Sequence, residues 1–265
     1  MSGRLAVRKT YKLFIGGAFP RSESGRTLEL EGYNVARASR KDARDSVVAA
    51  RKAFAGWSAA TAYNRGQVLY RLAETMETRA GAFAAASSGR REVARAIDRV
   101  VWYAGWADKL AQVLGSANPV AGPYFNFTLP EPTGVVAIVA PAEPALDGLV
   151  ARVAPALVGG NTVVVVASEA HPLAAIELAE AVATSDVPAG VVNVLTGVRS
   201  ELAPVLASHM DVNAIDVTGA DGEVAALEAL AAENVKRVVR AREDRSPWEI
   251  AAFMELKTVW HPIGR

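Results

Sequence analysis

The 265-residue sequence contains no cysteine. Disulfide bonds, thiolate metal sites and cysteine nucleophiles are therefore all excluded from this chain. The sequence also has no marked excess of either charge, with 29 Lys and Arg against 28 Asp and Glu. Such a balance gives no general electrostatic attraction for nucleic acid or an anionic membrane, so neither is expected as a partner.

Long hydrophobic runs are absent as well. The apolar stretch at residues 135–142 is far shorter than the ~20 residues that a membrane-spanning helix needs. Residues 1–10 carry arginine and lysine but no apolar stretch, so no secretory signal is expected. We therefore expect a cytoplasmic protein, with one large domain or two small ones at about 150 residues per domain.

Several signatures of catalysis and metal binding are also lacking. His171, His209 and His261 show no i, i+4 spacing, so no metal site is expected. The three-glycine dinucleotide fingerprint is missing, no tyrosine is followed by lysine four residues later, and no Gly-x-Ser-x-Gly elbow occurs. The enzyme classes that depend on these signatures have no residues to act with here.

The sequence after residue 133 alternates short β-branched runs with amphipathic segments, which is the pattern of βαβ units. Parallel strands joined by right-handed helical crossovers predict an α/β fold with a doubly wound, Rossmann-like sheet, whose ligand crevice lies beyond the carboxyl ends of the strands. The predicted strands are residues 135–139, 162–166, 191–195, 214–217 and 236–239. The loops at their carboxyl ends start near Ala140, Ala167, Thr196 and Thr218.

The first 120 residues have a different pattern. Residues 12–30 contain turn signals that predict a short hairpin. Residues 41–114 show helical spacing and predict two or three packed helices. We expect Trp102, Tyr103 and Trp106 to lie in the core instead of forming a ligand platform. One continuous apolar stripe is predicted from Leu69, Leu72, Ala73, Met76, Ala80 and Phe83.

The C-terminal segment combines charge with a capping signal. Ser246 to Glu249 has the order of a helix capping box and predicts a short helix through Leu256. Residues 258–260 predict a terminal strand. A solvated charge cluster is predicted from Arg240, Arg242, Glu243, Asp244 and Arg245.

Many segments follow one known pattern, namely residues 13–17, 24–27, 49–57, 65–69, 103–109, 124–136, 154–157, 160–164, 168–169, 188–197, 207–209 and 257–264. They resemble the aldehyde dehydrogenase superfamily over nearly the whole chain. The resemblance implies an NAD(P)-binding domain and the β-arm, a hairpin plus C-terminal strand, that the family uses for oligomerisation. The implied layout is a hairpin and helices at 1–120, a β-arm at 121–133 and 257–265, and a Rossmann-like domain at 134–240.

The departures from that family concern the catalytic domain. Family members carry this second large domain, with its nucleophilic cysteine and glutamate base, between the cofactor domain and the terminal strand. Here residues 236–238 run directly into the charge cluster, so we expect a truncated member that lacks the catalytic domain. The helical region also looks shortened around residues 86–91.

No catalytic residue is expected to remain. Aldehyde oxidation in the family needs a thiolate, which the composition excludes. The family asparagine that helps to hold the oxyanion aligns with Glu143, whose carboxylate would repel the developing negative charge.

Cofactor-binding candidates remain at five positions. The family Lys-Pro-Ser-Glu turn appears as residues 166–169, in which the lysine is lost while Ser168 and Glu169 are kept. Glu169 is expected either to contact a ribose or to serve as a carboxylate at a helix N-terminus. Arg199 replaces a family glycine and is expected to pair with phosphate or to be solvated, and Thr218 and Gly219 precede an alanine that replaces the family serine. NAD or NADP binding is therefore expected to be weak or absent.

Two functional hypotheses follow from these features, and a third is less informative. The first is a catalytically inactive family member that acts as a homo- or hetero-oligomerising partner or regulatory subunit of a full-length aldehyde dehydrogenase. The alternative is an NAD(P)-dependent oxidoreductase that acts on aldehydes with residual cofactor binding. A decayed remnant without a selected role is the third, against which the orderly alternation of elements argues.

Overall fold

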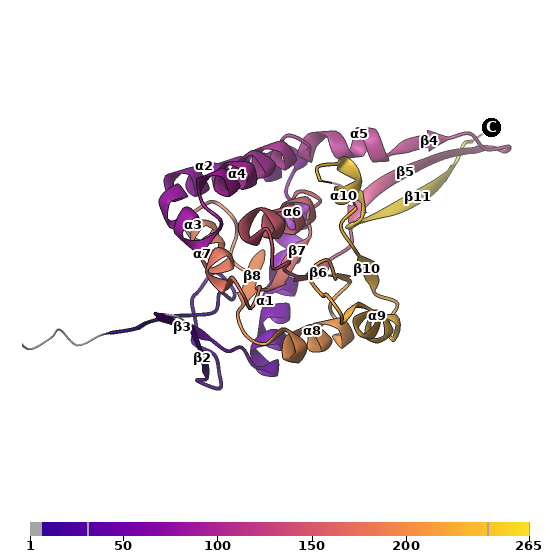
Figure 1. Cartoon of the computed structure of the whole chain (residues 1–265). Helices are drawn as coiled ribbons and strands as arrows, with labels where there is room; N and C mark the ends of the chain where they lie inside the picture. The colour runs from indigo at the N-terminus through magenta and orange to yellow at the C-terminus, as the bar shows by residue number, and fades with distance from the viewer. Residues whose placement is uncertain (1–6, 31, 243, 265) are drawn as a thin grey trace, which may run out of the picture.

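The computed structural model describes residues 7–30, 32–242 and 244–264. A five-stranded sheet lies at the centre of the molecule, and a narrow three-stranded arm projects from one end of the body (Figure 1). No helix within the described residues is long and apolar enough to cross a membrane.

The central sheet confirms the predicted α/β fold. Its strand order is β10-β9-β6-β7-β8, and all neighbouring strands are parallel. The strands are β6 (Val135–Val139), β7 (Thr162–Val166), β8 (Val192–Leu195), β9 (Ala214–Asp216) and β10 (Arg237–Val239). Every residue of the inner strands β6 and β7 is buried. Both faces of these strands are covered, so their sequences are continuous β-branched runs and do not alternate with polar residues.

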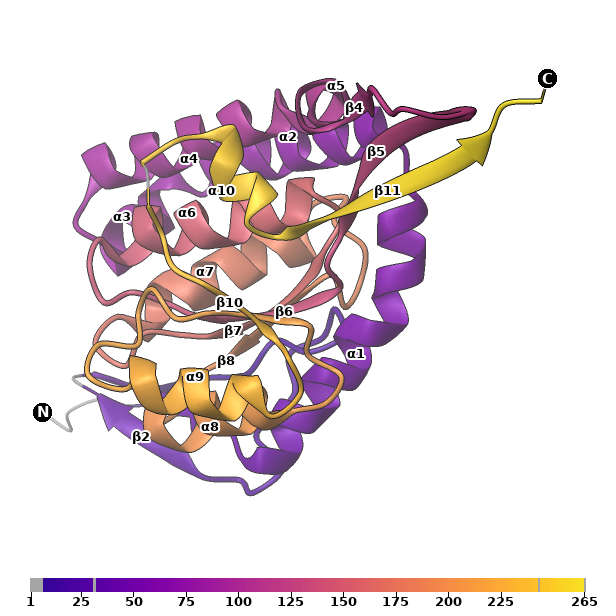
Figure 2. The ribbon, with the colours of Figure 1, turned by 90° about the vertical axis from the view of Figure 1, so that its right-hand side faces the viewer.

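Helices cover both faces of this sheet, as Figure 2 shows. Alternate residues of β6 point to opposite faces and belong to two separate hydrophobic clusters. One cluster includes α6 and α7, and the other includes α1, α8 and α9. The sheet is therefore doubly wound, as predicted. These helices are α1 (Arg40–Ala59), α6 (Ala145–Val158), α7 (Pro172–Ala183), α8 (Arg199–Ser208) and α9 (Val224–Ala232).

An outer layer of helices packs on α6 and α7. It consists of α2 (Ala62–Thr78), α3 (Ala80–Ala86) and α4 (Arg90–Ala104). The predicted apolar stripe faces the core, but it belongs to two helices because the chain turns at Arg79. The Arg79 guanidinium pairs with Glu177 and Glu180 of α7, against which α3 packs. Tyr103 is fully buried, and Trp102 and Trp106 pack against the same core, as predicted.

The N-terminal strands differ from the prediction. The hairpin predicted within residues 12–30 is present only as a tight turn at Gly16 and Gly17, where Ile15 and Ala18 exchange backbone hydrogen bonds. The regular strands of this region lie elsewhere, because β2 (Thr27–Leu30) pairs with β3 (Tyr33–Ala36) and β1 (Lys9–Tyr11) joins β3 in parallel. Residues 14 and 15 form only isolated bridges. The reason is that Phe14 exchanges backbone hydrogen bonds with Val194 of β8, which ties this segment to the central sheet.

The arm and the segment that leads into it complete the fold. Ser246 caps α10 by accepting a hydrogen bond from the Trp248 backbone, as predicted. The helix ends at Ala251 and not at Leu256, because the chain from Met254 onward pairs with β5. The remaining elements are η1 (Ala107–Lys109), α5 (Leu110–Leu114), β4 (Ser116–Asn118), β5 (Tyr124–Pro132), α10 (Pro247–Ala251) and β11 (Met254–Pro262).

Candidate functional site

The five sequence-predicted cofactor residues lie at the carboxyl edge of the central sheet. Ser168 and Glu169 follow β7, Arg199 is the first residue of α8 after β8, and Thr218 and Gly219 follow β9. Strand β7 lies on one side of β6 and β9 on the other, so the topological switch point is between β6 and β9. Ligands of open α/β sheets bind at this point. The role of these residues in cofactor binding stays a prediction.

Glu169 and Arg199 contact each other at this edge. Glu169 Oε1 accepts a hydrogen bond of 2.6 Å from the backbone N–H of Arg199. The Arg199 guanidinium donates to the carbonyl oxygens of Gly219, at 2.9 Å, and Asp221, at 3.4 Å, and lies 3.5 Å from Glu223. Glu169 is thus a carboxylate at a helix N-terminus, although the helix is α8 and not the α7 that follows it.

The other three predicted residues make local backbone contacts. Ser168 Oγ accepts a hydrogen bond from the His171 N–H at 3.3 Å, and Thr218 Oγ1 accepts one from the Ala241 N–H at 2.9 Å. Gly219 lies so close to the end of β6 that a Cβ atom would be 2.2 Å from the Ala140 carbonyl oxygen. Glycine is therefore required there for a close backbone approach.

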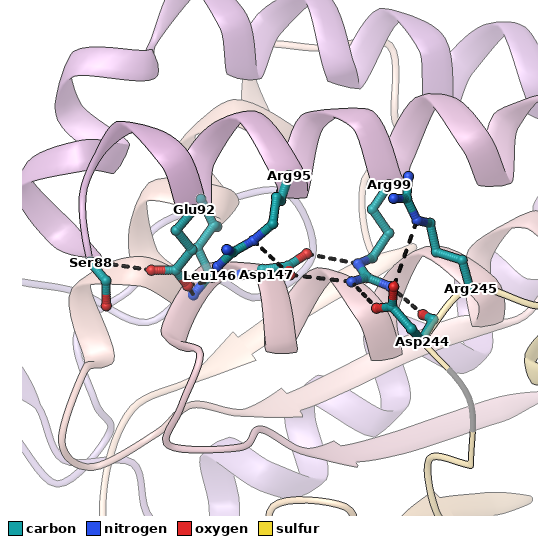
Figure 3. Close-up of polar contacts among 8 residues, drawn as sticks. All are labelled: Ser88, Glu92, Arg95, Arg99, Leu146, Asp147, Asp244 and Arg245. Carbon is teal, nitrogen blue, oxygen red and sulfur yellow. Dashed lines mark hydrogen bonds and ion pairs between the residues drawn. The ribbon is translucent and has the colours of Figure 1, made fainter.

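A carboxylate also occupies the N-terminus of α6. Glu92, from α4, accepts hydrogen bonds from the N–H groups of Leu146 and Asp147 at 2.7 and 3.1 Å, and from Ser88 at 2.7 Å (Figure 3). Burial alone would raise the pKa of Glu92, but the backbone N–H donors outweigh it and hold this pKa below its usual value. The helix that begins at the switch point therefore already carries an anion from the chain itself.

The N-termini of α6 and α8 already carry carboxylates from the chain itself. Backbone N–H groups at helix N-termini are the usual ligands of the phosphates of a dinucleotide. At α6 and α8 these donors already bind Glu92 and Glu169, and a phosphate would meet a carboxylate at each position. No group of three or more His, Asp or Glu side chains in the described part of the chain is arranged to hold a metal ion.

Glu143, which is predicted to take the family's oxyanion position, lies in the loop after β6. Its carboxylate is 2.7 Å from His171 Nε2, and both side chains are more than one-third exposed. Within the described ranges, this imidazole is the group that pairs with the Glu143 carboxylate. The position therefore carries an acceptor where the expected chemistry needs a donor.

Buried charge pairs near α6 were not predicted from the sequence. Arg99 of α4 binds Asp147 through two hydrogen bonds of 2.7 and 3.2 Å and also binds the exposed Asp244 (Figure 3). Burial lowers the pKa of Arg99, but the two carboxylates outweigh it and raise this pKa above its usual value. Asp244 belongs to the predicted charge cluster, whose other described members are exposed, whereas Glu243 lies outside the described residues.

A second buried network joins α6, β9 and α10. Arg152 is 1% exposed and binds Asp216 and Glu249, which are 0% and 3% exposed. Asp216 also accepts a hydrogen bond from Thr218 N–H at 2.9 Å, and Glu249 accepts one from Arg242 N–H at 2.9 Å. The network thus fixes the segment between β10 and β11 against the sheet. In the sequence, Arg152 interrupts an apolar helix. This interruption is the one signal that could have identified Arg152 as a buried, paired residue.

Lys236 lies at the amino-terminal edge of the sheet, opposite the candidate site. Its pKa allows the effect of burying a charge on stability to be measured. Its Nζ donates to the carbonyl oxygens of His209 and Val212, and burial lowers its pKa from 10.5 to about 8. Between these values the folded protein binds fewer protons than the unfolded chain, so stability should rise with pH.

We expect the free energy of unfolding of wild type, relative to Lys236→Met, to rise by roughly 2 kcal/mol between about pH 7 and about pH 9.5. Urea unfolding of both proteins at the two pH values measures it, and subtracting the variant cancels the other titrating groups. A difference that does not change with pH would show that the pKa of Lys236 is not lowered.

The arm presents an open strand edge. Its strand order is β11-β5-β4, so β4 covers one edge of β5 and β11 is the outer strand. No strand among the described residues pairs with the outer edge of β11. Figures 1 and 2 show β5 and β11 extending together away from the body. An exposed strand of nine residues is a template for pairing with another chain.

The hydrogen-bond register identifies the groups on that edge. Thr133 N–H donates to Phe253 O, and Ile263 N–H donates to Pro123 O, at the two ends of the β5–β11 ladder. Bonding alternates along an antiparallel pair, so the odd-numbered residues of β11 face β5. The even-numbered residues Leu256, Thr258 and Trp260 therefore direct their N–H and C=O groups outward.

The relatives of the chain are aldehyde dehydrogenases. The aldehyde dehydrogenase family model matches residues 28–260. Aldehyde dehydrogenase 1A1 of Homo sapiens is 33% identical over 267 residues, which cover 92% of this chain and 52% of the relative. Retinal dehydrogenase 2 of Gallus gallus is 35% identical over 276 residues, which cover 95% of this chain and 52% of the relative. The chain thus spans about half the length of the curated relatives it matches.

Solved structures have the same fold. HpcC from Thermus thermophilus matches with a TM-score of 0.82 and 31% identity, over 87% of this chain and 48% of that one. A point mutant of betaine aldehyde dehydrogenase from Staphylococcus aureus, solved with NAD+ bound and a modified cysteine, matches with a TM-score of 0.80 and 25% identity, over 86% and 49% of the two chains. By its sequence over residues 28–260 and by its fold, the chain belongs to the aldehyde dehydrogenase family.

Proposed function

We propose that this chain is a catalytically inactive subunit that assembles through its arm with a full-length aldehyde dehydrogenase. The observation that carries the proposal is the open edge of β11, on an arm that extends beyond the body of the chain. Only residues 240–253 separate β10 from β11 along the chain, which leaves no catalytic-domain sheet between them for the arm to extend. The partner is expected to supply the strand that pairs with this edge.

We propose that the chain is catalytically inactive because of the residues that it lacks and the residues that replace them. The sequence has no cysteine to form a thiohemiacetal with an aldehyde. Glu143 places a carboxylate where an oxyanion would need a hydrogen-bond donor, so a thiol from another chain would not restore the site. We place the protein in the cytoplasm, in keeping with relatives that are named as cytosolic enzymes.

The alternative function is NAD(P)-dependent aldehyde oxidation with residual cofactor binding. Its support is the retained five-stranded sheet, which is similar to that of a neighbour solved with NAD+. Against it stand the carboxylates of Glu92 and Glu169 at the N-termini of α6 and α8. We therefore propose that NAD and NADP bind weakly or not at all.

Titration calorimetry distinguishes these two functions. We expect no binding heat and no thermal shift with NAD+ or NADP+ at millimolar concentration, because a phosphate would displace a carboxylate that already binds each helix N-terminus. Saturable binding of either nucleotide would instead support the oxidoreductase alternative.

Co-expression tests the assembly. We expect an affinity-tagged copy of this chain to co-purify with an untagged full-length aldehyde dehydrogenase from the same organism. A control with Thr258→Pro and Trp260→Pro should retain less of the enzyme, since it lacks two of the backbone donors that face the outer edge of β11. Equal recovery with both baits would contradict a role for the arm.

A further inference from the structure

We propose that Glu169 and Arg199 form an internal latch that takes the place of a bound phosphate at the N-terminus of α8. The latch consists of the Glu169 carboxylate, the Arg199 backbone N–H and the Arg199 guanidinium. It holds the carboxyl edge of the sheet ordered and closed without a ligand. The inference goes beyond the proposed assembly and does not depend on it.

The first half of the latch is the carboxylate at the start of α8. Glu169 comes from the loop after β7, and its Oε1 lies 2.6 Å from the N–H of Arg199, the first helical residue. The side chain of the preceding residue, Val198, cannot cap this end, because it has no polar atom. A negative charge at this point is stabilised by the free N–H groups and the helix dipole, as a phosphate would be.

The second half is the guanidinium, which ties α8 to the loop after β9. It donates to the carbonyl oxygens of Gly219 and Asp221 and lies near the Glu223 carboxylate. Arg199 Nε is buried and has no hydrogen-bond partner among the described residues, so the arginine is held in place by its terminal nitrogens. The pair therefore connects the loops that follow β7, β8 and β9.

The close approach of Gly219 to β6 completes the closure. Its N–H donates to Val139 O at 3.1 Å, and a Cβ atom there would clash with Ala140 O at 2.2 Å. Any movement of this loop would break the contacts of Arg199 with Gly219 and Asp221. The latch and the loop thus stabilise the same edge of the sheet.

Hydrogen exchange of the purified chain tests the latch. We expect the Arg199 amide to exchange about fivefold faster in Glu169→Ala than in wild type, with a smaller increase in Glu169→Gln, whose amide oxygen still accepts a hydrogen bond. Glu201→Gln is the matched control, because Glu201 is also a first-turn carboxylate of α8 but pairs with Arg37. Circular dichroism confirms that each variant is folded.

Arg199→Ala tests the other half. The amides of residues 219–223 should exchange faster in this variant, whereas millimolar NAD+ or inorganic pyrophosphate should leave exchange at Arg199 unchanged in wild type. The proposal is wrong if the Arg199 amide exchanges at the wild-type rate in Glu169→Ala. It is also wrong if NAD+ or pyrophosphate slows exchange of the Arg199 amide in wild type. Because these measurements use the chain alone, their failure is distinguishable from failure of the assembly with a partner.

Discussion

Replacing Arg152 with methionine should lower the free energy of unfolding by about 3 to 5 kcal/mol. Arg152 is buried between Asp216 and Glu249, and its guanidinium also lies 5.6 Å from the Phe253 ring. Without it, two carboxylates remain in the interior without the positive charge that offsets their desolvation. Because Glu249 belongs to α10, the segment between β10 and β11 should loosen first.

Denaturant unfolding of wild type and variant measures this loss. Arg71→Met is the matched control, because Arg71 pairs with Glu74 at the surface, where solvent screens the charges, and its loss should leave stability almost unchanged. Adding Asp216→Asn and Glu249→Gln to Arg152→Met should recover part of the stability, since both carboxylates are then neutral. An Arg152→Met protein as stable as its Arg71→Met counterpart would refute the role of the network.

Replacing Thr258 with proline should weaken assembly with a full-length aldehyde dehydrogenase by at least about tenfold. The backbone N–H of Thr258 faces the outer edge of β11, so proline removes a donor that the proposed partner strand would use. The ladder to β5 uses the odd-numbered residues, and proline is tolerated on an edge strand whose N–H faces outward. The arm should therefore stay folded.

Thr258→Val is the matched control for that prediction. Both variants lose the contact of 3.1 Å between the Thr258 and Thr128 hydroxyls, but valine keeps the backbone N–H. Surface plasmon resonance with immobilised enzyme should give wild-type affinity for valine and much weaker binding for proline. Equal affinity in the two variants would mean that the partner does not pair with this edge.

The sequence predicted the central sheet well because burial leaves a simple signal there. Each of the five strands lies within one residue of its predicted run, since strands covered on both faces are rich in β-branched apolar residues. The buried Asn193 and Asp216 are exceptions. The hairpin within residues 12–30 was predicted only in part, because its first arm also pairs with the central sheet. Phe14 pairs with Val194, which lies in a strand far along the chain, and local turn signals carry no information about such a partner.

Charged residues were the hardest to place from sequence. Arg152 and Asp147 only interrupt an otherwise apolar stretch of the sequence, and Glu249 was predicted only as part of a helix cap. Each instead pairs in the interior with a residue far along the chain, such as Arg99 with Asp147. Amphipathic spacing shows which face of a helix is buried, but it does not identify the charge on the neighbouring element.

The sequence predicted which edge of the sheet holds the candidate cofactor residues, but it did not predict their contacts with one another, and their role stays a prediction. The rule for open α/β sheets places Glu169, Arg199 and Gly219 at one edge. Their pairing depends on the loop conformations after β7 and β9, which spacing alone does not determine. The two interpretations of Arg199, a phosphate ligand or a solvated side chain, both missed its bonds to backbone carbonyls.

The most direct test of the account is the mass of the assembly. Light scattering during size exclusion should give, for a micromolar mixture of this chain and a full-length aldehyde dehydrogenase from the same organism, a species heavier than either protein alone. The complex should contain both polypeptides in a fixed ratio. Two separately eluting proteins, with this chain a monomer in the presence of the enzyme, would contradict the proposed role.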